Sequence, residues 1–193
     1  MVLRGFAASR GVALLAAVDA ITAGAPWRHM LTPAGAMSVA MSNCGDYGWV
    51  SDRQGYRYSP VDPQSGQPWP AMPLLFSELA GEAALAVGFA DFRPDACLIN
   101  RYVENARMGL HQDKDEQDMS QPIVSVSLGL PAVFQFGGHK RSEPVQRVLL
   151  EHGDVVVWGG SDRLRYHGIQ PLKPGLHALT GPYRFNLTFR KAC

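Results

Sequence analysis

His111, Asp113 and His167 are residues whose types and spacing suit a metal ion. Two histidines and one carboxylate occupy one face of a non-heme Fe(II) ion and leave the other positions open for co-substrate and O₂. Residues two apart on a β-strand point to the same side, so His111 and Asp113 can reach one ion together. His167 must then come from a strand folded back beside them. Because His-x-Asp pairs also occur in surface loops, the triplet alone is only a hypothesis.

The segment 184–190 is a second candidate for chemistry. With a period of two, one face carries polar side chains: Arg184, Asn186, Thr188 and Arg190. This could be an ordinary amphipathic strand with its polar face in water. Two arginines and an amide could equally bind a small dicarboxylate, because the guanidinium fork matches carboxylates. Asn100 and Tyr102 share one side of another predicted strand and could donate hydrogen bonds to the same ligand.

The composition indicates a globular protein. The chain has 193 residues, which fits one domain, with 46% hydrophobic and 18% charged residues. A net charge of +1 argues against a protein that coats nucleic acid electrostatically, but not against one with a local basic groove. The three cysteines are scattered and fit neither a disulfide framework nor a zinc site, so we expect a reducing, cytoplasmic location. The apolar stretch 12–23 is too short to cross a membrane.

The order of elements predicts a mainly β fold with flanking helices, in the α+β class. Helices are expected over 12–23 and 73–87, and a strand over 37–42. From residue 96 onward, short β-type runs recur between turn signals: 96–103, 123–128, 132–136, 145–151, 155–158, 165–170 and 184–190. His152-Gly153-Asp154 predicts a tight hairpin turn. The pattern favours a sandwich or jelly roll, with 1–193 as a single domain. Within it, 1–95 would supply helices and substrate-binding strands and loops, and 96–193 the core.

The chain resembles the AlkB family of Fe(II)/2-oxoglutarate-dependent dioxygenases, bacterial members in particular. The resemblance runs from about residue 5 to 190 and includes the spacing His111-x-Asp113…His167…Arg184-x-Asn186-x-Thr188-x-Arg190. Further matching stretches are 42–45, 53–56, 94–102, 110–116 and 155–160. Motifs of that length are far more specific than the triplet alone. The resemblance implies a double-stranded β-helix, a jelly-roll variant.

The resemblance also implies roles for the polar residues. His111, Asp113 and His167 would bind iron as the catalytic metal site. Arg190 would pair with the distal carboxylate of 2-oxoglutarate and count among the catalytic residues. The rest of the co-substrate would be held by Asn100, Tyr102, Arg184 and Asn186. With O₂ as the other co-substrate, the products would be succinate and CO₂. The cofactors carry this chemistry, and the protein supplies orientation.

Other residues are expected to recognise a base flipped out of its stack. A lone Trp is usually core, but Gly48 before Trp49 suggests a loop, and the resemblance makes Trp49 a stacking partner opposite His111. Asp115 could belong to a solvated charge run, or could favour cationic bases by Coulomb attraction. Further substrate-site candidates are Met41, Tyr56 and Arg141, the last in the basic loop 137–141, with Arg53 and Arg57 for backbone contacts.

The expected activity is oxidative demethylation of 1-methyladenine and 3-methylcytosine in DNA, with release of formaldehyde and direct repair of the base. The partner would be alkylated single- or double-stranded DNA, with RNA left open, and the protein a monomer without membrane attachment. One alternative is a 2-oxoglutarate dioxygenase with a protein, lipid or small-molecule substrate. Another is a jelly-roll binding module with a vestigial triplet. An intact Asn186 and Arg190 weaken the binding-module alternative.

Overall fold

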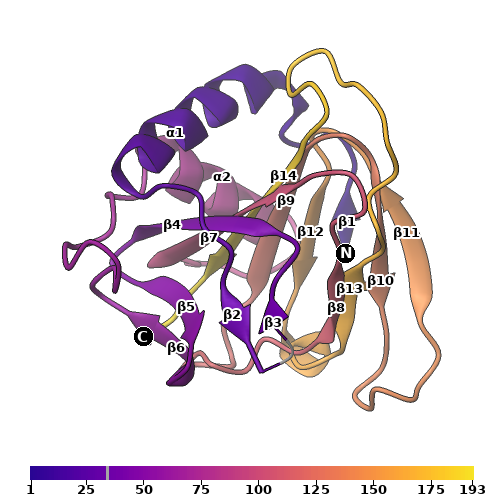
Figure 1. The fold of residues 1–193 in the computed structure, drawn as a ribbon. Helices are drawn as coiled ribbons and strands as arrows, with labels where there is room; N and C mark the ends of the chain where they lie inside the picture. The colour runs from indigo at the N-terminus through magenta and orange to yellow at the C-terminus, as the bar shows by residue number, and fades with distance from the viewer. Residues whose placement is uncertain (34) are drawn as a thin grey trace.

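The fold consists of two large β-sheets with helices on one side (Figure 1). The computed structural model describes residues 1–33 and 35–193. The six-stranded sheet has the order β1 (Val2–Leu3), β12 (Val155–Trp158), β9 (Ile123–Gly129), β14 (Arg184–Arg190), β7 (Ala96–Tyr102) and β4 (Ala40–Gly45). The four-stranded sheet has the order β11 (Gln146–Leu150), β10 (Ala132–Phe136), β13 (His167–Ile169) and β8 (Met108–His111). This architecture confirms the predicted jelly-roll core with flanking helices.

Strand β14 lies in the middle of the larger sheet, antiparallel to both β7 and β9. Its apolar face, with Leu187 and Phe189, packs toward helices α1 (Gly11–Gly24) and α2 (Leu74–Leu85). Phe189 meets Phe76 of α2 edge-on, at 5.7 Å between ring centroids. Burying one such side chain contributes about 1.5–3 kcal/mol. The strand's polar face is therefore turned the other way, toward the space between the two sheets.

Helix α1 forms because its apolar residues recur at helical spacing. Gly11, Leu14, Val18 and Ile21 are buried, and they lie three or four residues apart on one face. In α2 the buried residues follow the same rule, from Phe76 to Ala84. Both helices agree with the predicted spans to within two residues. Among the described residues, neither helix is long and apolar enough to cross a membrane.

Two small hairpins lie along one edge of the large sheets (Figure 1). One pairs β2 (Leu31–Thr32) with β3 (Gly35–Ala36), and the other pairs β5 (Gly48–Asp52) with β6 (Gly55–Ser59). Gly55 follows the turn of the second hairpin with φ +100°, a conformation that favours glycine. Two short 3₁₀ helices complete the elements: η1 (Ala8–Arg10) and η2 (Gly160–Asp162).

Most of the predicted strands are confirmed, and three expectations need correction. The turn 152–154 does not close a hairpin, because β11 and β12 on either side of it belong to different sheets. The strand expected over 37–42 is shifted and occupies Ala40–Gly45. Strands β5, β6 and β8 were not predicted. For β4 and β8, pairing with segments distant in the sequence overrides the local pattern.

Arg28 and Asp62 form a buried ion pair that fixes the loop after β6. Both carboxylate oxygens accept hydrogen bonds from the guanidinium, with Nη2 2.7 Å from Oδ2. The same guanidinium lies over the ring of Trp69, 5.3 Å from its centroid. The backbone N–H of Arg28 donates to the carbonyl of Met41 in β4 at 3.0 Å. The pair therefore ties the loop behind the β5–β6 hairpin to the edge of the large sheet.

We expect Asp62→Asn to lower the free energy of unfolding by about 3 kcal/mol, because it leaves a buried guanidinium without its counter-charge. Urea unfolding at neutral pH measures the change. The matched control is Glu104→Gln, which removes an exposed carboxylate; it should stay within about 0.5 kcal/mol of the wild type. Equal losses in the two variants would contradict a specific role for the ion pair.

Candidate metal centre and co-substrate pocket

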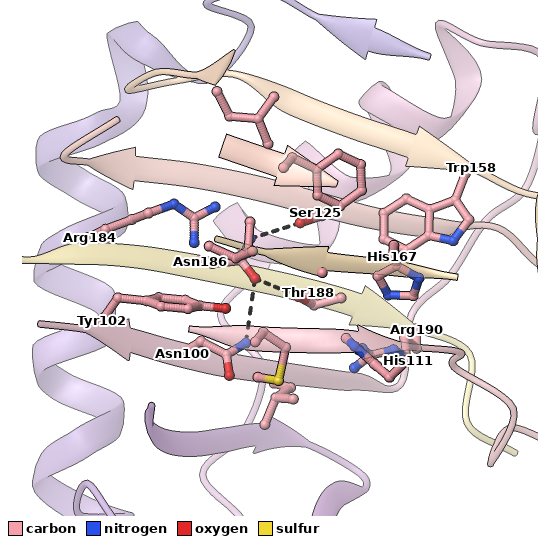
Figure 2. Close-up of a pocket in the computed structure, with 16 residues that line it drawn as sticks. Asn100, Tyr102, His111, Ser125, Trp158, His167, Arg184, Asn186, Thr188 and Arg190 are labelled. Atoms are coloured by element: carbon pink, nitrogen blue, oxygen red, sulfur yellow. Dashed lines mark hydrogen bonds between the residues drawn. The ribbon is translucent and has the colours of Figure 1, made fainter. Parts of the chain in front are cut away.

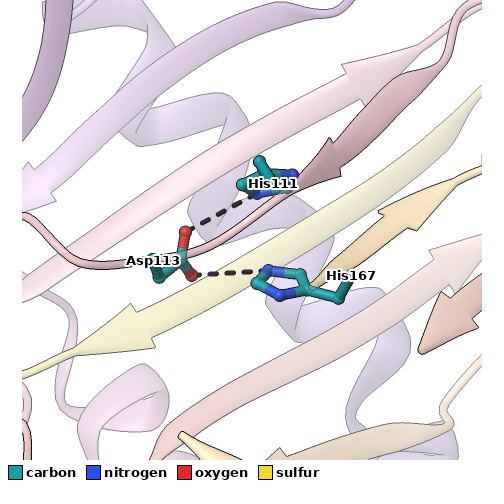
Figure 3. A group of neighbouring side chains, drawn as sticks. All are labelled: His111, Asp113 and His167. Atoms are coloured by element: carbon teal, nitrogen blue, oxygen red, sulfur yellow. Dashed lines mark ion pairs between the residues drawn. The ribbon is translucent and has the colours of Figure 1, made fainter. Parts of the chain in front are cut away.

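His111, Asp113 and His167 meet where β8 ends and β13 begins (Figure 3). The strand register places His111 directly opposite His167, with ring centroids 4.4 Å apart. Asp113 lies two residues beyond His111 and reaches back to both rings. Its Oδ1 is 3.6 Å from Nε2 of His111, and its Oδ2 is 3.6 Å from Nε2 of His167. The three ligand atoms lie within 4.8 Å of one another, so a single cation can contact all of them.

Hydrogen bonds to the backbone orient both imidazole rings. Nδ1 of His111 lies 2.9 Å from the carbonyl oxygen of Gly109, and Nδ1 of His167 lies 3.1 Å from that of Arg165. Because a carbonyl can only accept, Nδ1 carries the proton and Nε2 offers its lone pair to the shared space. Burial in the site, together with the neighbouring His167, lowers the pKa of His111 to about 4. The ring is therefore neutral at pH 7, as a metal ligand must be.

Arg190 lies at the metal end of the site. Its Nε and Nη2 donate to Oδ2 of Asp113 at 2.9 and 2.6 Å. Burial alone would raise the pKa of Asp113, but the Arg190 guanidinium outweighs it and holds that pKa well below its usual range. Asp113 is therefore a carboxylate. Arg190 was expected at the distal carboxylate of a co-substrate, whereas here its charge is compensated by a candidate metal ligand.

Arg184 lies at the opposite, closed end and is the cation without a counter-charge. Its side chain is among the most buried in the protein, at 1% exposure. Nη2 donates to Oγ of Ser127 at 3.0 Å, whereas Nε and Nη1 have no hydrogen-bond partner among the described residues. The guanidinium lies 4.9 Å from the centroid of the Tyr102 ring. A buried, unpaired guanidinium is costly, and a carboxylate ligand would remove that cost.

A row of hydrogen-bonded side chains lies between the two ends (Figure 2). Nδ2 of Asn186 donates to Oγ of Ser125 at 2.8 Å, and its Oδ1 accepts from Oγ1 of Thr188 at 2.9 Å. Asn100 donates to the same oxygen at 3.4 Å, while its own Oδ1 has no partner among the residues described. These residues line a cavity of about 50 Å³ that runs between the sheets from Arg184 to the two histidines.

The cavity fits a small dicarboxylate that also reaches a metal. Its apolar lining comes from both sheets, with Phe134, Leu150 and Ile169 from the smaller one and Leu98 and Trp158 from the larger one. The polar row of β14 and β7 lies on the larger sheet. The unpaired donors of Arg184 suit a terminal carboxylate at the closed end, and the histidine–aspartate cluster suits a chelated cation at the other. The donor set therefore fits Fe(II) and 2-oxoglutarate together.

A wide groove opens beside the metal cluster. Its lining includes all five predicted substrate residues: Met41, Trp49, Tyr56, Asp115 and Arg141. The rings of Trp49 and Tyr56 are stacked, with centroids 5.6 Å apart and planes 15° apart. Nε1 of Trp49 donates to Oδ2 of Asp115 at 3.0 Å. Trp49 lies in strand β5 and not in the loop that the sequence suggested, but its strand still presents the ring to the groove.

The structure changes the expectation for one basic residue and adds others. Arg57 donates to both oxygens of Asp52, so its charge is compensated locally. Ser125 lines the pocket and Ser127 accepts a hydrogen bond from Arg184, and the clean alternation of 124–128 could have indicated both. Glu116 is buried, although it stands in a charge run that looked solvated. Two of its hydrogen-bond partners carry no local sequence signal: Tyr58 and Arg163.

We expect one equivalent of Mn(II) to bind the wild-type protein and His167→Ala to weaken this binding by more than about 100-fold. Loss of a direct ligand should exceed the 10- to 100-fold effect of losing an outer partner. Electron paramagnetic resonance of free Mn(II) measures the affinity. The control is His139→Ala, which removes an exposed histidine far from the cluster in sequence. Wild-type affinity in His167→Ala would overturn the assignment.

Comparison with known proteins agrees with this geometry. The family model of the 2OG-Fe(II) oxygenase superfamily matches residues 1–190. Alpha-ketoglutarate-dependent dioxygenase AlkB of Escherichia coli (strain K12) is 60% identical over 193 residues, covering 100% of this chain and 89% of that protein. Nucleic acid dioxygenase ALKBH1 of Homo sapiens is 32% identical over 127 residues, covering 65% of this chain and 32% of that protein. The solved structure of OsALKBH1 superposes with a TM-score of 0.86 at 30% identity, covering 98% of this chain and 95% of that chain. The chain therefore belongs to the AlkB family of the 2OG-Fe(II) oxygenase superfamily.

Proposed function

We propose that this dioxygenase demethylates 1-methyladenine and 3-methylcytosine in DNA and so repairs alkylated bases directly, with RNA as a second nucleic acid to test. The observation that carries the proposal is the groove beside the metal cluster, where an aromatic pair and a carboxylate lie together. Stacked rings suit a flipped base, and base flipping is required to bring an N-methyl group to a buried metal. The name of the human relative, a nucleic acid dioxygenase, supports a nucleic-acid substrate.

The residues divide into two sets by their position in the cavity. His111, Asp113 and His167 would hold Fe(II). Arg184 and Tyr102, at the closed end, would hold the distal carboxylate of 2-oxoglutarate. Residues nearer the metal would orient the remainder of the co-substrate: Asn100, Asn186 and Arg190. When bound, Fe(II) with 2-oxoglutarate and O₂ supplies the oxidising power, and succinate and CO₂ are the by-products.

The protein's own part is to orient the base and to exclude water. Trp49 and Tyr56 would present a flat surface for stacking, with the ring of His111 lining the same groove. Phe134 and Trp158 lie beside the ring of His167, with centroids 6.3 and 4.9 Å away, and would exclude water from the cavity near the metal. Hydroxylation of an N-methyl group leaves a hydroxymethyl adduct, which releases formaldehyde and restores the base.

Asp115 accounts for a preference for cationic bases. The carboxylate lies at the groove surface and is held by the indole of Trp49. A methylated adenine or cytosine carries a positive charge, which a nearby carboxylate stabilises more than it stabilises a neutral base. The basic loop 137–141 contributes Arg141 to the same groove, where it could contact a phosphate or a base edge.

A monomer in a reducing cytoplasm completes the proposal. Cys44, Cys97 and Cys193 are free, and the first two are buried in the core. Free buried thiols are typical of reducing compartments. We also treat 1–193 as one domain, because strand β1 near the beginning of the chain pairs with β12, inside the region predicted as the core.

Arg184→Lys should raise the KM for 2-oxoglutarate by about 10- to 100-fold, because a single ammonium cannot replace the charged fork at a buried carboxylate. Succinate formation at varied 2-oxoglutarate concentration measures it. The control is Arg147→Lys, on an exposed position of β11, which should leave KM unchanged. An unaltered KM in Arg184→Lys would show that another residue holds the distal carboxylate.

The central test is a repair assay with Fe(II), 2-oxoglutarate and single-stranded DNA containing 3-methylcytosine. We expect restored cytosine and one formaldehyde per succinate, both dependent on 2-oxoglutarate. Single strands are favourable because no base pair has to be broken. Formation of succinate without any repaired base would contradict the proposal. A substrate outside nucleic acids would then be the better hypothesis.

The same assay, run on Asp115→Asn, tests the charge preference. The variant should lose about tenfold in kcat/KM for cationic 3-methylcytosine, which corresponds to about 1.4 kcal/mol. It should lose much less for neutral 3-methylthymine. Equal losses for both bases would mean that Asp115 acts through shape or folding and not through charge.

A further inference from the structure

Arg163 is a buried arginine that the proposed reaction does not use. It directly follows η2 and is 3% exposed. Its three nitrogens donate to three different acceptors: Nη1 to the backbone carbonyl of Asp113 at 2.7 Å, Nη2 to Oε2 of Glu116 at 2.9 Å, and Nε to the carbonyl of Gln121 at 3.1 Å. All three acceptors belong to the segment 113–121. Arg163 therefore holds the segment that begins with a metal ligand.

Glu116 extends this contact to two further elements. Its Oε1 accepts from the hydroxyl of Tyr58 at 2.7 Å and lies 3.3 Å from Nε of Arg190. Arg190 in turn donates to the side chain of Asp113. The Glu116 side chain is almost fully buried, so these contacts are little screened by water. Two cations and two anions alternate here, and each carboxylate depends on a guanidinium for its charge balance.

The Tyr58 contact reaches the strand pair that recognises the base. Tyr58 lies in β6 directly opposite Trp49 of β5 in the antiparallel register. Trp49 also donates its indole N–H to Asp115, the neighbour of Glu116. The hairpin is thus attached to consecutive residues of the segment 113–121 by two side-chain hydrogen bonds. A shift of that segment would move the metal carboxylate and the hairpin together.

We propose that Arg163 is a positioning residue that sets the metal carboxylate and the β5–β6 hairpin relative to each other, with Glu116 and Tyr58 as the link. Arg163 touches neither metal nor base in this arrangement and acts only through the residues it holds. The part of the proposal that concerns nucleic acid rests on the proposed function. The part that concerns the metal ligand does not.

An arginine is required here because its acceptors lie in three directions. A planar guanidinium can donate to all three at once, whereas a lysine ammonium at the end of a flexible chain cannot match that fork. Arg163→Lys therefore keeps the buried charge next to Glu116 and removes the geometry. Tyr58→Phe is the milder variant, because it removes one hydroxyl and keeps the ring.

The experiment compares full-length wild type, Arg163→Lys, Tyr58→Phe and the double variant, with Arg147→Lys as a surface control on β11. Mn(II) affinity is measured by electron paramagnetic resonance without 2-oxoglutarate. Binding of single-stranded DNA containing 3-methylcytosine to the Mn(II)-loaded protein is measured by fluorescence anisotropy. Circular dichroism gives the folded fraction, and both affinities are expressed per folded molecule.

We expect Arg163→Lys to weaken Mn(II) binding by about tenfold, which is the size of effect expected when a residue that orients a metal-ligating side chain is replaced. It should weaken DNA binding as well. Tyr58→Phe should weaken DNA binding by about fivefold, through loss of one buried hydrogen bond, and leave Mn(II) binding unchanged. In the double variant, the effects on DNA binding should be less than additive, because both act through Glu116.

Wild-type Mn(II) affinity in folded Arg163→Lys would overturn the proposal, as would strictly additive effects on DNA binding. If Arg163→Lys does not fold, unchanged DNA binding in Tyr58→Phe overturns the link to the hairpin, and weakened DNA binding with unchanged Mn(II) affinity supports it. If the wild type does not prefer the methylated strand, the proposed function fails while the Mn(II) comparison still decides the role of Arg163.

Discussion

The pairing of β14 with two neighbours is the constraint on which the site depends. Because β7 and β9 bond to both edges of this strand and the helices cover its apolar face, its polar residues have to lie between the sheets. Buried polar groups need partners. Asn186 finds Ser125, and Thr188 finds Asn186. Only Arg184 is left with unpaired donors among the described residues of this row. These buried donors of Arg184, which have no hydrogen-bond partner among the described residues, therefore mark a position where a ligand is needed.

The two arginines of β14 differ in their electrostatic surroundings, and in the proposed function this difference would orient the co-substrate. Both lie on the polar face of the strand, one at each end. Arg190 faces Asp113 and Glu116, so its charge is already compensated. Arg184 has hydroxyl and aromatic neighbours, and burial without a carboxylate lowers its pKa. A dicarboxylate entering the cavity would meet an uncompensated cation at one end only, so one carboxylate would be drawn inward and the other would remain near the metal.

Local sequence patterns predicted the elements that build the core and were weaker at the site's edges. The alternation of 184–190 and 123–128 survives because both faces of those strands are specified by burial. Arg184 and Arg190 share one face of their strand, so the alternation does not predict which of them lies near the metal. That depends on where β8 and β13 end. Strand β8 is formed by its pairing with β13, which starts 56 residues after β8 ends, and the burial of Glu116 depends on Arg163, 47 residues away. These features depend on contacts between segments that are distant in the sequence, and the local periodicity does not predict such contacts.

The contact between Trp49 and Asp115 shows how a substrate site can be organised before substrate arrives. An ionised carboxylate has about four lone-pair positions, and the indole N–H uses one of them on Oδ2. The remaining positions stay available to the N–H groups of a base, so binding does not have to break the existing hydrogen bond. In the proposed function, Trp49 would offer a ring face for stacking and at the same time restrain the carboxylate that selects for charge. Restraint of this kind lowers the entropy lost on binding, and it would help the β5–β6 hairpin to discriminate between bases.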